Sequence, residues 1–301
     1  MARVSLEHVL ANGSKLFGYA WKIEKPSAHV MIMTGMEEHS TRYDHLALFL
    51  NKQGYDVFCL DHFGQGETAK HNEGSKGQMP EHAFRLFTEA IHQFVLNLRK
   101  DGKPVFLLGH SMGSFAAQEY IQRYGESIDK VVLSGSNGPD FMVKVGSLLA
   151  KITVPKRSYA KPSKFLASLT FGGFSKAIKN PRTSFDWLSY NEDNVNKYID
   201  DPDCGYGSSK GFYREFLKAL ARVHKPKFMR KIPKDLPILL IAGEEDPVGH
   251  QGVGVTKLEQ YYLKFGQTKV KKILYKHMRH EILNETDKQK VYADVLAFLK
   301  A

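Results

Sequence analysis

Two patterns of hydrophobic and polar residues alternate along the 301-residue chain. Short runs of apolar, often β-branched residues recur, and the longer stretches between them carry apolar residues at helical spacing. Such runs are typical of strands buried in a parallel sheet, where helices make the crossover connections. The predicted parallel strands are residues 29–35, 55–61, 104–110, 130–136, 237–243 and 270–275. The pattern therefore predicts an α/β protein with a mostly parallel, doubly wound sheet.

Helices are predicted between these strands. Residues 81–100 place several apolar side chains on one helical face. These are Phe84, Phe87, Ile91, Phe94, Val95 and Leu98. Further helices are predicted at residues 41–54, 116–125, 252–265 and 283–300. Near the N-terminus, Asn12 and Gly13 lie between two alternating segments, which predicts an antiparallel hairpin at one edge of the sheet.

The alternation stops between residues 137 and 232, a segment rich in Lys, Phe, Pro and Gly. We expect this segment to be a helical cap inserted into a core made of residues 1–136 and 233–301. Apolar residues make up 42% and charged residues 25% of the chain, which is typical of globular proteins and argues against disordered and fibrous classes. Residues 141–232 contain 18 basic and 7 acidic residues, and the remainder contains 25 of each. The formal net charge of +11 therefore belongs to residues 141–232, which lie within the predicted cap.

The basic cap favours peripheral contact with anionic membranes or anionic amphiphiles. In the first part of the predicted cap, apolar residues fall along one helical face. These are Phe141, Val145, Leu148, Leu149 and Ile152. We favour packing of this face on the protein, where it lines an acyl pocket, and the alternative is entry into a membrane interface. The aromatic residues Phe165, Phe171, Phe174, Phe185 and Trp187 are expected in the cap core and the pocket lining. Nucleic acid is not an expected partner, because the sequence contains no recognition module.

The sequence shows no secretory or membrane-spanning segment. The N-terminal residues lack the apolar stretch of a secretory signal, and the longest apolar runs fall far below the roughly 18 residues of a membrane span. Cys59 and Cys204 cannot form a disulfide framework, and neither has the neighbouring Cys or His spacing of a metal site. We therefore expect a cytoplasmic protein with reduced thiols. The sequence gives no indication of the oligomeric state.

The segment LLGHSMGSF, residues 107–115, places Ser111 between two glycines at the end of a predicted strand. Gly109 and Gly113 permit a tight strand-to-helix turn, in which a larger side chain would collide with the neighbouring backbone. A serine hydroxyl is a weak nucleophile at neutral pH, so it needs a base and an acid that orients the base. In open α/β sheets such groups gather at the carboxyl ends of the strands.

Acids and histidines follow other predicted strands. Asp246 comes after strand 237–243, and both His277 and His280 come after strand 270–275. Asp140, which follows strand 130–136, is an alternative acid. The order serine, acid, histidine is the chain order of the α/β-hydrolase triad. The residues alone therefore predict nucleophilic catalysis and leave the choice between the two histidines open.

Five segments resemble motifs of a known family. TGMEEHSTRY (34–43) resembles HGxxEHSxRY, DHFGQGET (61–68) resembles DHxGHGxS, and GHSMGS (109–114) resembles the family's nucleophile turn. RHEILNE (279–285) is similar to its histidine segment, and residues 185–205 are similar to its cap. The family is the monoglyceride lipase and lysophospholipase branch of the α/β hydrolases, often grouped with the serine aminopeptidases.

The resemblance implies the α/β-hydrolase fold, with His280 as the base and the backbone N–H groups of Met36 and Met112 as the oxyanion hole. Met112 also follows from mechanism, because the residue after the nucleophile begins a helix whose N–H groups point at the developing oxyanion. Thr34 and Gln65 replace two histidines that are thought to brace loops in the family, while the triad is unchanged.

Glu38 and Arg42 stand four residues apart, which predicts a structural salt bridge on one helical turn. By the resemblance, the alternative role of this pair is to bind a polar head group of the substrate.

The expected function is hydrolysis of carboxylic esters of lipid-like substrates through an acyl-enzyme. Ser111 is the expected nucleophile, His280 the base, and Asp246 the residue that orients the imidazole. The resemblance implies monoacylglycerols or lysophospholipids as substrates. One alternative is a broad small-ester or aryl-ester carboxylesterase, and another is a non-catalytic ligand-binding protein of the same fold. The chemistry requires no metal and no organic cofactor.

Overall fold

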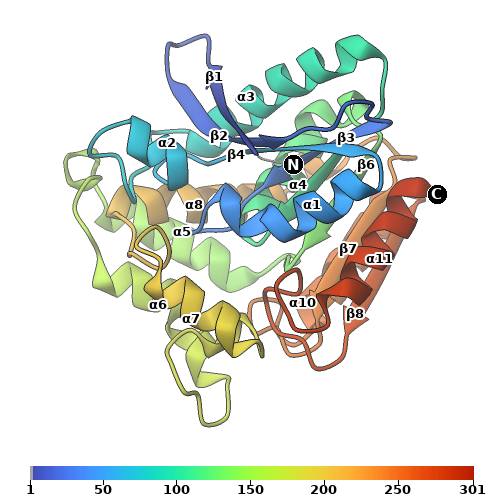
Figure 1. Ribbon diagram of the computed structural model, residues 1–301. Coiled ribbons are helices and arrows are strands. Elements are labelled where there is room, and N and C mark those ends of the chain that lie inside the picture. Colours follow the sequence, from blue (N-terminus) through green and yellow to red (C-terminus); the bar gives the residue numbers. More distant parts are fainter. Residues whose placement is uncertain (1–2) are drawn as a thin grey trace.

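A sheet of eight strands forms the centre of the computed structural model, which describes residues 3–301 (Figure 1). The side chains of Lys164 and residues 169–172 lie outside this description. The strands are β1 (Val4–Val9), β2 (Lys15–Trp21), β3 (Ala28–Met33), β4 (Tyr55–Leu60), β5 (Val105–His110), β6 (Lys130–Ser134), β7 (Ile238–Gly243) and β8 (Val270–Tyr275). Their order across the sheet is β1-β2-β4-β3-β5-β6-β7-β8.

Most neighbouring strands run parallel, as the buried apolar runs predict. Every pairing from β4 to β8 is parallel, whereas β2 is antiparallel to both β1 and β4. β1 and β2 form the predicted hairpin, with Leu16 opposite His8 in the register. The predicted fold class, a mostly parallel sheet with an antiparallel N-terminal edge, is therefore confirmed.

Helices cover both faces of the sheet and bury a separate apolar cluster on each. On one face lie α3 (Ala83–Leu98), α4 (Met112–Tyr124) and α10 (Val253–Lys264). On the other lie α1 (Asp44–Lys52) and α11 (Lys288–Lys300). The short helix α2 (Gly66–His71) packs beside β2. β3, β4, β5 and β7 are buried along their whole length, as expected for strands with helices on both sides.

The predicted helices are confirmed; four are shorter than predicted, and α4 is longer because it begins at Met112. In α3 the predicted apolar face packs into the core, with Phe94 and Leu98 at its partly buried margin. α1 begins at Asp44 rather than at residue 41, because Ser40–Tyr43 form a 3-10 turn first. α11 begins at Lys288, so the loop after β8 is longer than predicted.

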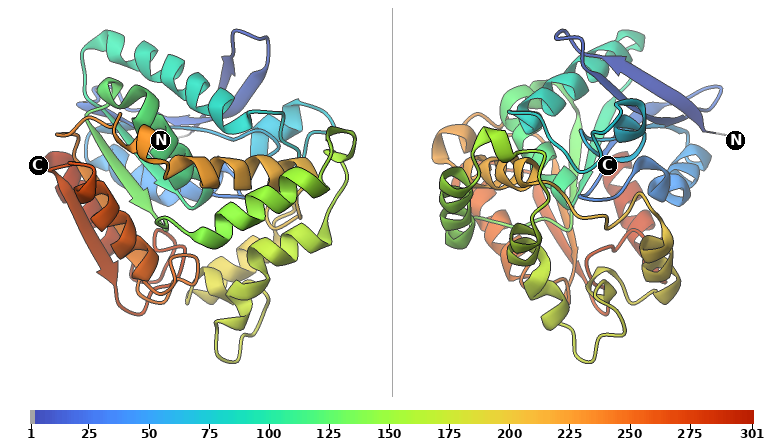
Figure 2. Two further views of the ribbon diagram at one scale, coloured as in Figure 1. Left: turned by 180° about the vertical axis from the view of Figure 1, so that it is seen from behind. Right: turned by 90° about the vertical axis from the view of Figure 1, so that its left-hand side faces the viewer.

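The segment between β6 and β7 forms five helices. They are α5 (Phe141–Thr153), α6 (Lys164–Lys176), α7 (Glu192–Asp200), α8 (Lys210–Val223) and α9 (Pro226–Met229). α5 runs alongside α8, and α6 lies farther from the sheet (Figure 2). The apolar side of α8, including Phe212 and Phe216, belongs to the same buried cluster as α3 and α4. The division into a core and a cap at residues 137–232 stays a prediction, and α8 is the part of this segment that packs into the main core.

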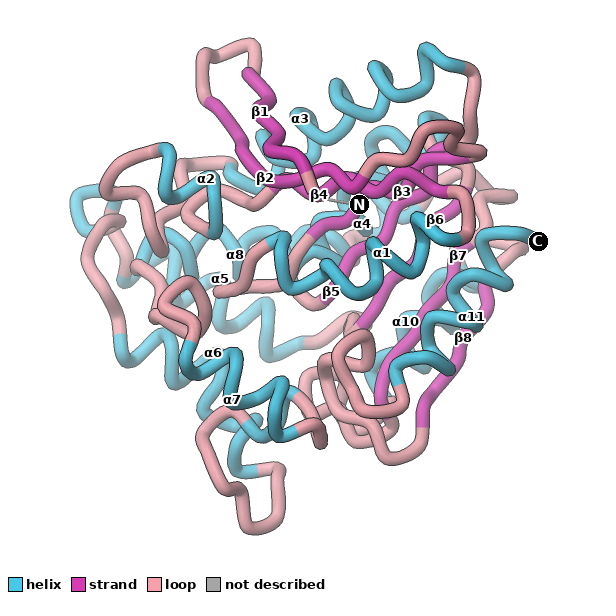
Figure 3. Tube along the Cα trace, in the orientation of Figure 1, coloured by secondary structure: helices cyan, strands magenta, loops and turns pink. Residues whose placement is uncertain are grey.

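The predicted site residues lie on loops at the carboxyl ends of the strands. Ser111 directly follows β5, Asp246 comes three residues after β7, and His280 lies on the loop after β8. These loops are drawn in pink in Figure 3. Among the described residues, no helix is both long enough and apolar enough to cross a membrane.

Candidate active site

Ser111 occupies a crowded turn between β5 and α4. Its backbone adopts φ 50° and ψ −119°, a conformation that residues other than glycine rarely adopt. A Cβ atom added to Gly109 would lie 2.4 Å from the carbonyl oxygen of Gly113, and one added to Gly113 would lie 2.1 Å from that of Met33. Both glycines are therefore required by close backbone contacts, as predicted. The strained turn presents the Ser111 side chain at the top of the sheet.

Ser111, His280 and Asp246 form a hydrogen-bonded row. Nε2 of His280 lies 2.8 Å from Ser111 Oγ, and Nδ1 lies 2.9 Å from Asp246 Oδ2. The other carboxylate oxygen of Asp246 accepts a hydrogen bond from the backbone N–H of Val248 at 2.8 Å. In this arrangement the imidazole can take the serine proton while the buried carboxylate orients the ring.

The alternative base and acid lie apart from this row. The side chain of His277 is 90% exposed and faces Glu245 at 3.5 Å. Asp140 accepts a hydrogen bond from the backbone N–H of Met142 and so caps the N-terminus of α5. The geometry therefore selects His280 and Asp246 from the candidates that the sequence left open.

The charges around His280 favour its protonated form. Burial alone would lower the pKa of His280, but the carboxylates of Asp246 and Glu281 outweigh it and raise the pKa above its ordinary value. Burial, together with the charge on His280, lowers the pKa of the neighbouring His110 to about 3, which keeps His110 neutral. The indole of Trp187 also lies close to the imidazole of His280, with ring centroids 5.3 Å apart.

The residues predicted to form the oxyanion hole flank Ser111. Met112 is the first residue of α4, where a backbone N–H has no partner within the helix. Met36 lies on the loop after β3, and a Cβ atom added to the preceding Gly35 would be 3.3 Å from Ser111 Cβ. Both residues are thus placed beside the nucleophile, and their role as oxyanion donors stays a prediction.

Gln65 braces the loop that carries Met36. Its side-chain oxygen accepts a hydrogen bond from the backbone N–H of Glu37 at 2.7 Å, and its side-chain nitrogen donates to the carbonyl oxygen of Gly35 at 2.9 Å. Gln65 therefore supplies one acceptor and one donor at the position where the family has a histidine. At the other replaced position, the side chain of Thr34 does not brace a loop. Its buried hydroxyl has no hydrogen-bond partner among the described residues.

Arg42 is held by acidic side chains beneath the site. It lies 2.9 Å from Glu38 and makes a two-point ion pair with Glu281 at 2.5 and 2.7 Å. It also donates to the side-chain oxygen of Asn194 at 3.0 Å. Burial disfavours the charged guanidinium, but the two carboxylates outweigh this and raise the pKa of Arg42 further. Burial raises the pKa of Glu38, whereas Arg42 overcomes burial at Glu281 and lowers its pKa to about 2.

This network favours the structural interpretation of Glu38 and Arg42. Glu38 lines the cavity beside Ser111, whereas Arg42 lines a separate polar cleft. Glu281 and Asn194 were not predicted, although Glu281 directly follows His280 in the sequence. No local pattern could have linked them to Arg42, because both lie more than a hundred residues away in the chain.

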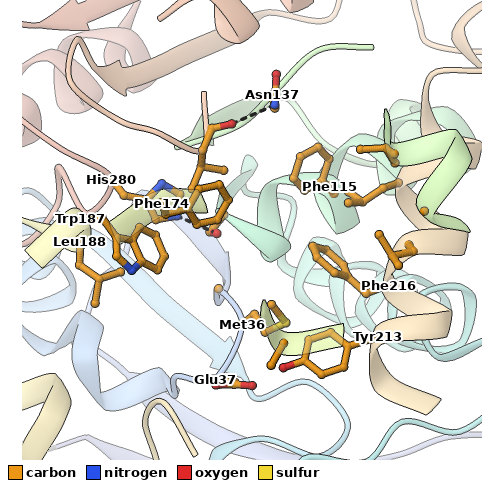
Figure 4. Close-up of a pocket in the computed structure, with 18 of the residues that line it drawn as sticks. Met36, Glu37, Phe115, Asn137, Phe174, Trp187, Leu188, Tyr213, Phe216 and His280 are labelled. Carbon is orange, nitrogen blue, oxygen red and sulfur yellow. Dashed lines mark hydrogen bonds between the residues drawn. The ribbon is translucent and has the colours of Figure 1, made fainter. Parts of the chain in front are cut away.

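A cavity of about 650 Å³ opens beside Ser111 (Figure 4). Phe174, Trp187 and Leu188 lie near His280, while Phe115 and Phe216 line the opposite side. Phe174, Phe185 and Trp187 line the cavity as predicted. Phe165 instead is 74% exposed, and the side chain of Phe171 lies outside the described residues. Among the lining residues that were not predicted are Glu37, Phe115, Tyr213 and Phe216.

The apolar face of α5 divides between the cavity and the surface. Val145 and Leu149 line the cavity, as the packing prediction requires, although Leu149 is also 50% exposed. Phe141, Leu148 and Ile152 instead remain 73%, 58% and 71% exposed. The prediction that this whole face packs on the protein is therefore wrong for these three residues, because their side chains are exposed to solvent.

Comparisons with known proteins agree with this fold. Residues 24–287 match the family described as "Serine aminopeptidase, S33". The chain is 32% identical to human monoglyceride lipase over 250 residues, which cover 80% of this chain and 73% of that protein. It is 26% identical to phospholipase YtpA of Bacillus subtilis over 284 residues, which cover 93% and 98% of the two chains. A thermostable carboxyl esterase from Bacillus coagulans superposes on this chain with a TM-score of 0.91 at 27% identity. The superposition covers 100% of this chain and 98% of the esterase chain.

Proposed function

The chain belongs to the serine aminopeptidase (S33) family of α/β hydrolases, and from this we propose that it cleaves carboxylic esters of single-chain lipids. Monoacylglycerols and lysophospholipids are the proposed substrates. The observation that carries the proposal is the row Ser111, His280 and Asp246, with 2.8 and 2.9 Å between their atoms, at the wall of an apolar cavity. The similarity to a monoglyceride lipase and to a phospholipase supports the choice of lipid esters.

In the proposed reaction, Ser111 Oγ attacks the ester carbonyl carbon while His280 takes the hydroxyl proton. Asp246 stabilises the imidazolium, and the backbone N–H groups of Met36 and Met112 donate to the oxyanion. The tetrahedral intermediate then breaks the bond to the alcohol oxygen, which leaves with the proton from His280. Water attacks the acyl-enzyme by the same route, releases the carboxylic acid and restores the serine.

The cavity supports a substrate with one long apolar chain. Phe115 and Phe216 line one side and Phe174 and Trp187 another, so a hydrocarbon chain would exchange water for aromatic and aliphatic walls. A volume of about 650 Å³ lies within the range of small-molecule sites.

The exposed face of α5 supports peripheral contact with a membrane. Phe141, Leu148 and Ile152 are exposed on α5, the helix from which Val145 and Leu149 line the cavity. Lys144 and Lys151 on the same helix are also exposed. An apolar helix face with lysines beside it favours the interface of an anionic bilayer. We propose that this face holds the cavity mouth at the lipid surface.

A second candidate function is a carboxylesterase that acts on small or aryl esters. The TM-score of 0.91 with a carboxyl esterase, which covers almost the whole of both chains, is the observation that favours it. The two candidates share the reaction and differ in the length of the acyl group.

Covalent labelling tests the nucleophile. We expect a fluorophosphonate to add once to the protein, and peptide mapping to place the adduct on Ser111, with no adduct in Ser111→Ala. Ser114→Ala is a matched control, because Ser114 lies on α4 three residues away, is buried and bonds to the carbonyl oxygen of Ser111. Folded protein whose Ser111 stays unlabelled would contradict the proposed function and favour a non-catalytic ligand-binding protein.

A series of esters tests the substrate class. We expect kcat/KM to rise with acyl length across monoacylglycerols and p-nitrophenyl esters, because each buried CH₂ group contributes about 0.8 kcal/mol. Highest turnover on acetyl or butyryl esters would reject the lipid substrate and support the small-ester candidate.

A further inference from the structure

We propose that His39, Asp201 and Cys204 form a binding site for a divalent transition-metal ion such as Zn²⁺. His39 lies on the loop after β3, and the other two residues follow α7. One potential ligand atom from each residue lies within 4.8 Å of the other two. The sequence does not reveal this cluster, because His39 stands 165 positions before Cys204 in the chain.

The three donor atoms suit zinc. Zn²⁺ binds imidazole nitrogen, thiolate sulfur and carboxylate oxygen at about 2.0–2.3 Å, usually with tetrahedral geometry. Ligand atoms on such a tetrahedron stand roughly 3.3–3.8 Å apart. Binding therefore requires small shifts within the cluster, and His39 Nε2 and Asp201 Oδ2, which lie 2.9 Å apart, would move slightly apart. Magnesium and calcium prefer all-oxygen sites, so the thiol selects against them. Three protein ligands leave the fourth position for water or an exchangeable ligand.

His39 already has a partner that can fix the required tautomer. Its Nε2 lies 2.9 Å from Asp201 Oδ2, and its Nδ1 lies 2.9 Å from Thr41 Oγ1. When Nε2 binds a metal, the ring proton must be on Nδ1, and the Thr41 hydroxyl can accept a hydrogen bond from it. Such a contact behind a metal-binding histidine is the usual way in which its ring is oriented.

Cys204 supplies the soft ligand and one proton. The residue is 6% exposed, and its side chain belongs to the class of ligand that Zn²⁺ binds as a thiolate. A bound metal ion deprotonates a coordinating thiol. The Cys204 S–H bond therefore breaks as the S–metal bond forms, and one proton leaves to the buffer.

The cluster is accessible from solvent. His39, Thr41 and Asp201 line a polar cleft of about 740 Å³ on the outside of the protein, separate from the cavity beside Ser111. The side chains of His39 and Asp201 are 13% and 33% exposed. A hydrated ion can therefore reach two of its ligands before it binds the buried sulfur.

Metal binding at this place would connect two parts of the chain that form the cavity wall. Gly205, next to Cys204, lines the cavity and donates its backbone N–H to the carbonyl oxygen of Glu37 at 3.1 Å. Glu37 is two residues from His39 and also lines the cavity. A bound ion would therefore hold the loop after α7 against the loop after β3.

Cobalt and zinc titrations test the site without any measurement of hydrolysis. Metal-free protein should bind one equivalent of Co²⁺ and show a thiolate-to-cobalt charge-transfer band in the near ultraviolet. Zn²⁺ should abolish the band, and excess Mg²⁺ should not. Calorimetry with Zn²⁺ in buffers of different ionisation enthalpy should report the release of about one proton per metal ion.

Variants identify the ligands. Cys204→Ala and Cys204→Ser should both lose the charge-transfer band, and Asp201→Asn should weaken Zn²⁺ binding at least 10-fold. Cys59→Ala is the matched control, because Cys59 is the other buried free cysteine and lies in β4; this variant should behave as the unmodified chain does. Circular dichroism and fluorophosphonate labelling check that each variant is folded. No band in the unmodified protein, or equal Zn²⁺ affinity in a folded Cys204 variant, would overturn the site and indicate adventitious binding by surface histidines.

Discussion

Arg42 and Glu281, 239 positions apart in the chain, meet in a two-point ion pair with N–O distances of 2.5 and 2.7 Å. Both side chains are less than a tenth exposed, and Glu38 shares the same guanidinium. The pair joins the loop after β3 to the loop after β8, so it connects the segment of Met36 with the segment of His280. Its disruption should therefore affect both stability and turnover.

Arg42→Gln should destabilise the fold strongly. The change leaves two buried carboxylates without their cation, and removal of one partner of a buried ion pair typically costs about 3–5 kcal/mol. Arg42→Lys should lose less, because it keeps the charge and loses the planar two-point geometry. Urea unfolding followed by circular dichroism measures both variants.

A surface ion pair supplies the control for this measurement. Arg99 lies 2.7 Å from Asp129, but their side chains are 36% and 38% exposed. Arg99→Gln should therefore change the free energy of unfolding by no more than about 1 kcal/mol. Equal losses in Arg42→Gln and Arg99→Gln would contradict the importance of the buried network.

The pH dependence of hydrolysis should follow His280. Only the neutral imidazole can accept the serine proton, so kcat/KM should fall as the pH drops through the pKa of His280. Because this pKa is raised above its ordinary value of about 6.5, the acidic limb of the profile should have its midpoint above that pH. A midpoint below the ordinary histidine value would contradict the assigned electrostatics.

Asp246→Asn should move this limb to lower pH. The variant loses the carboxylate that favours imidazolium, so the pKa of His280 should decrease while kcat falls by up to roughly 10⁴-fold. NMR titration of the His280 ring protons in the Ser111→Ala background measures the pKa without turnover. An unchanged titration in Asp246→Asn would show that another group sets the pKa.

Gln65 should contribute to turnover through the position of the Met36 amide. Gln65→Ala removes both hydrogen bonds to the loop, and a displacement of about 1 Å at a catalytic group can cost roughly 10²-fold in rate. We expect kcat to fall by about 10-fold or more with little change in KM. Gln65→His restores the residue of the family motif and should retain most of the activity, because imidazole also offers one donor and one acceptor. Equal activity in the alanine variant would show that the loop holds its geometry unaided.

Thr34→Val should leave the protein as stable as before or stabilise it by about 1 kcal/mol. The buried Thr34 hydroxyl has no partner among the described residues, and valine has nearly the same shape without the polar atom. Thermal unfolding measures the change. A loss above about 1 kcal/mol would show that this hydroxyl makes a hydrogen bond in solution, for example to an ordered water.

Serine substitutions at Phe141, Leu148 and Ile152 should weaken binding to anionic vesicles. The combined variant removes three exposed apolar groups from α5, so we expect the partition coefficient to fall at least about 10-fold in vesicle sedimentation. Turnover of a short water-soluble ester should stay unchanged. Leu263→Ser is the control, because Leu263 is 52% exposed on α10. Added salt should reduce binding of the unmodified protein, and indifference to both salt and anionic lipid would reject the membrane contact.

The sequence predicted the sheet and the row of site residues for the same physical reason. Buried strands appear as continuous apolar runs, and Ser111, Asp246 and His280 each follow such a run, so their approach depends only on the parallel arrangement of strand ends. The choice between His277 and His280 required the family motif, because both lie on one loop and only tertiary packing buries His280.

The cavity and the buried ion network could not be predicted in this way. Phe216 and Tyr213 reach the site from α8, so their contacts depend on how the segment between β6 and β7 folds. Glu281 reaches Arg42 from the loop after β8, so this contact depends on how two loops far apart in the chain pack together. For the apolar face of α5, the sequence favoured packing on the protein over exposure, whereas Phe141, Leu148 and Ile152 are exposed. Helical periodicity identifies an apolar face, but it does not show whether protein or solvent covers that face.

The packing of α8 limits how the inserted segment could be exchanged between relatives. Because Phe212, Phe216 and Val223 complete the same apolar cluster as α3 and α4, excision at residues 137 and 232 would open the protein interior to water. A chimera that replaces only residues 141–209 would keep that layer intact. Chimeras in which a relative's segment replaces only residues 141–209 should fold and show new acyl preferences. Chimeras that replace the whole of residues 137–232 should aggregate.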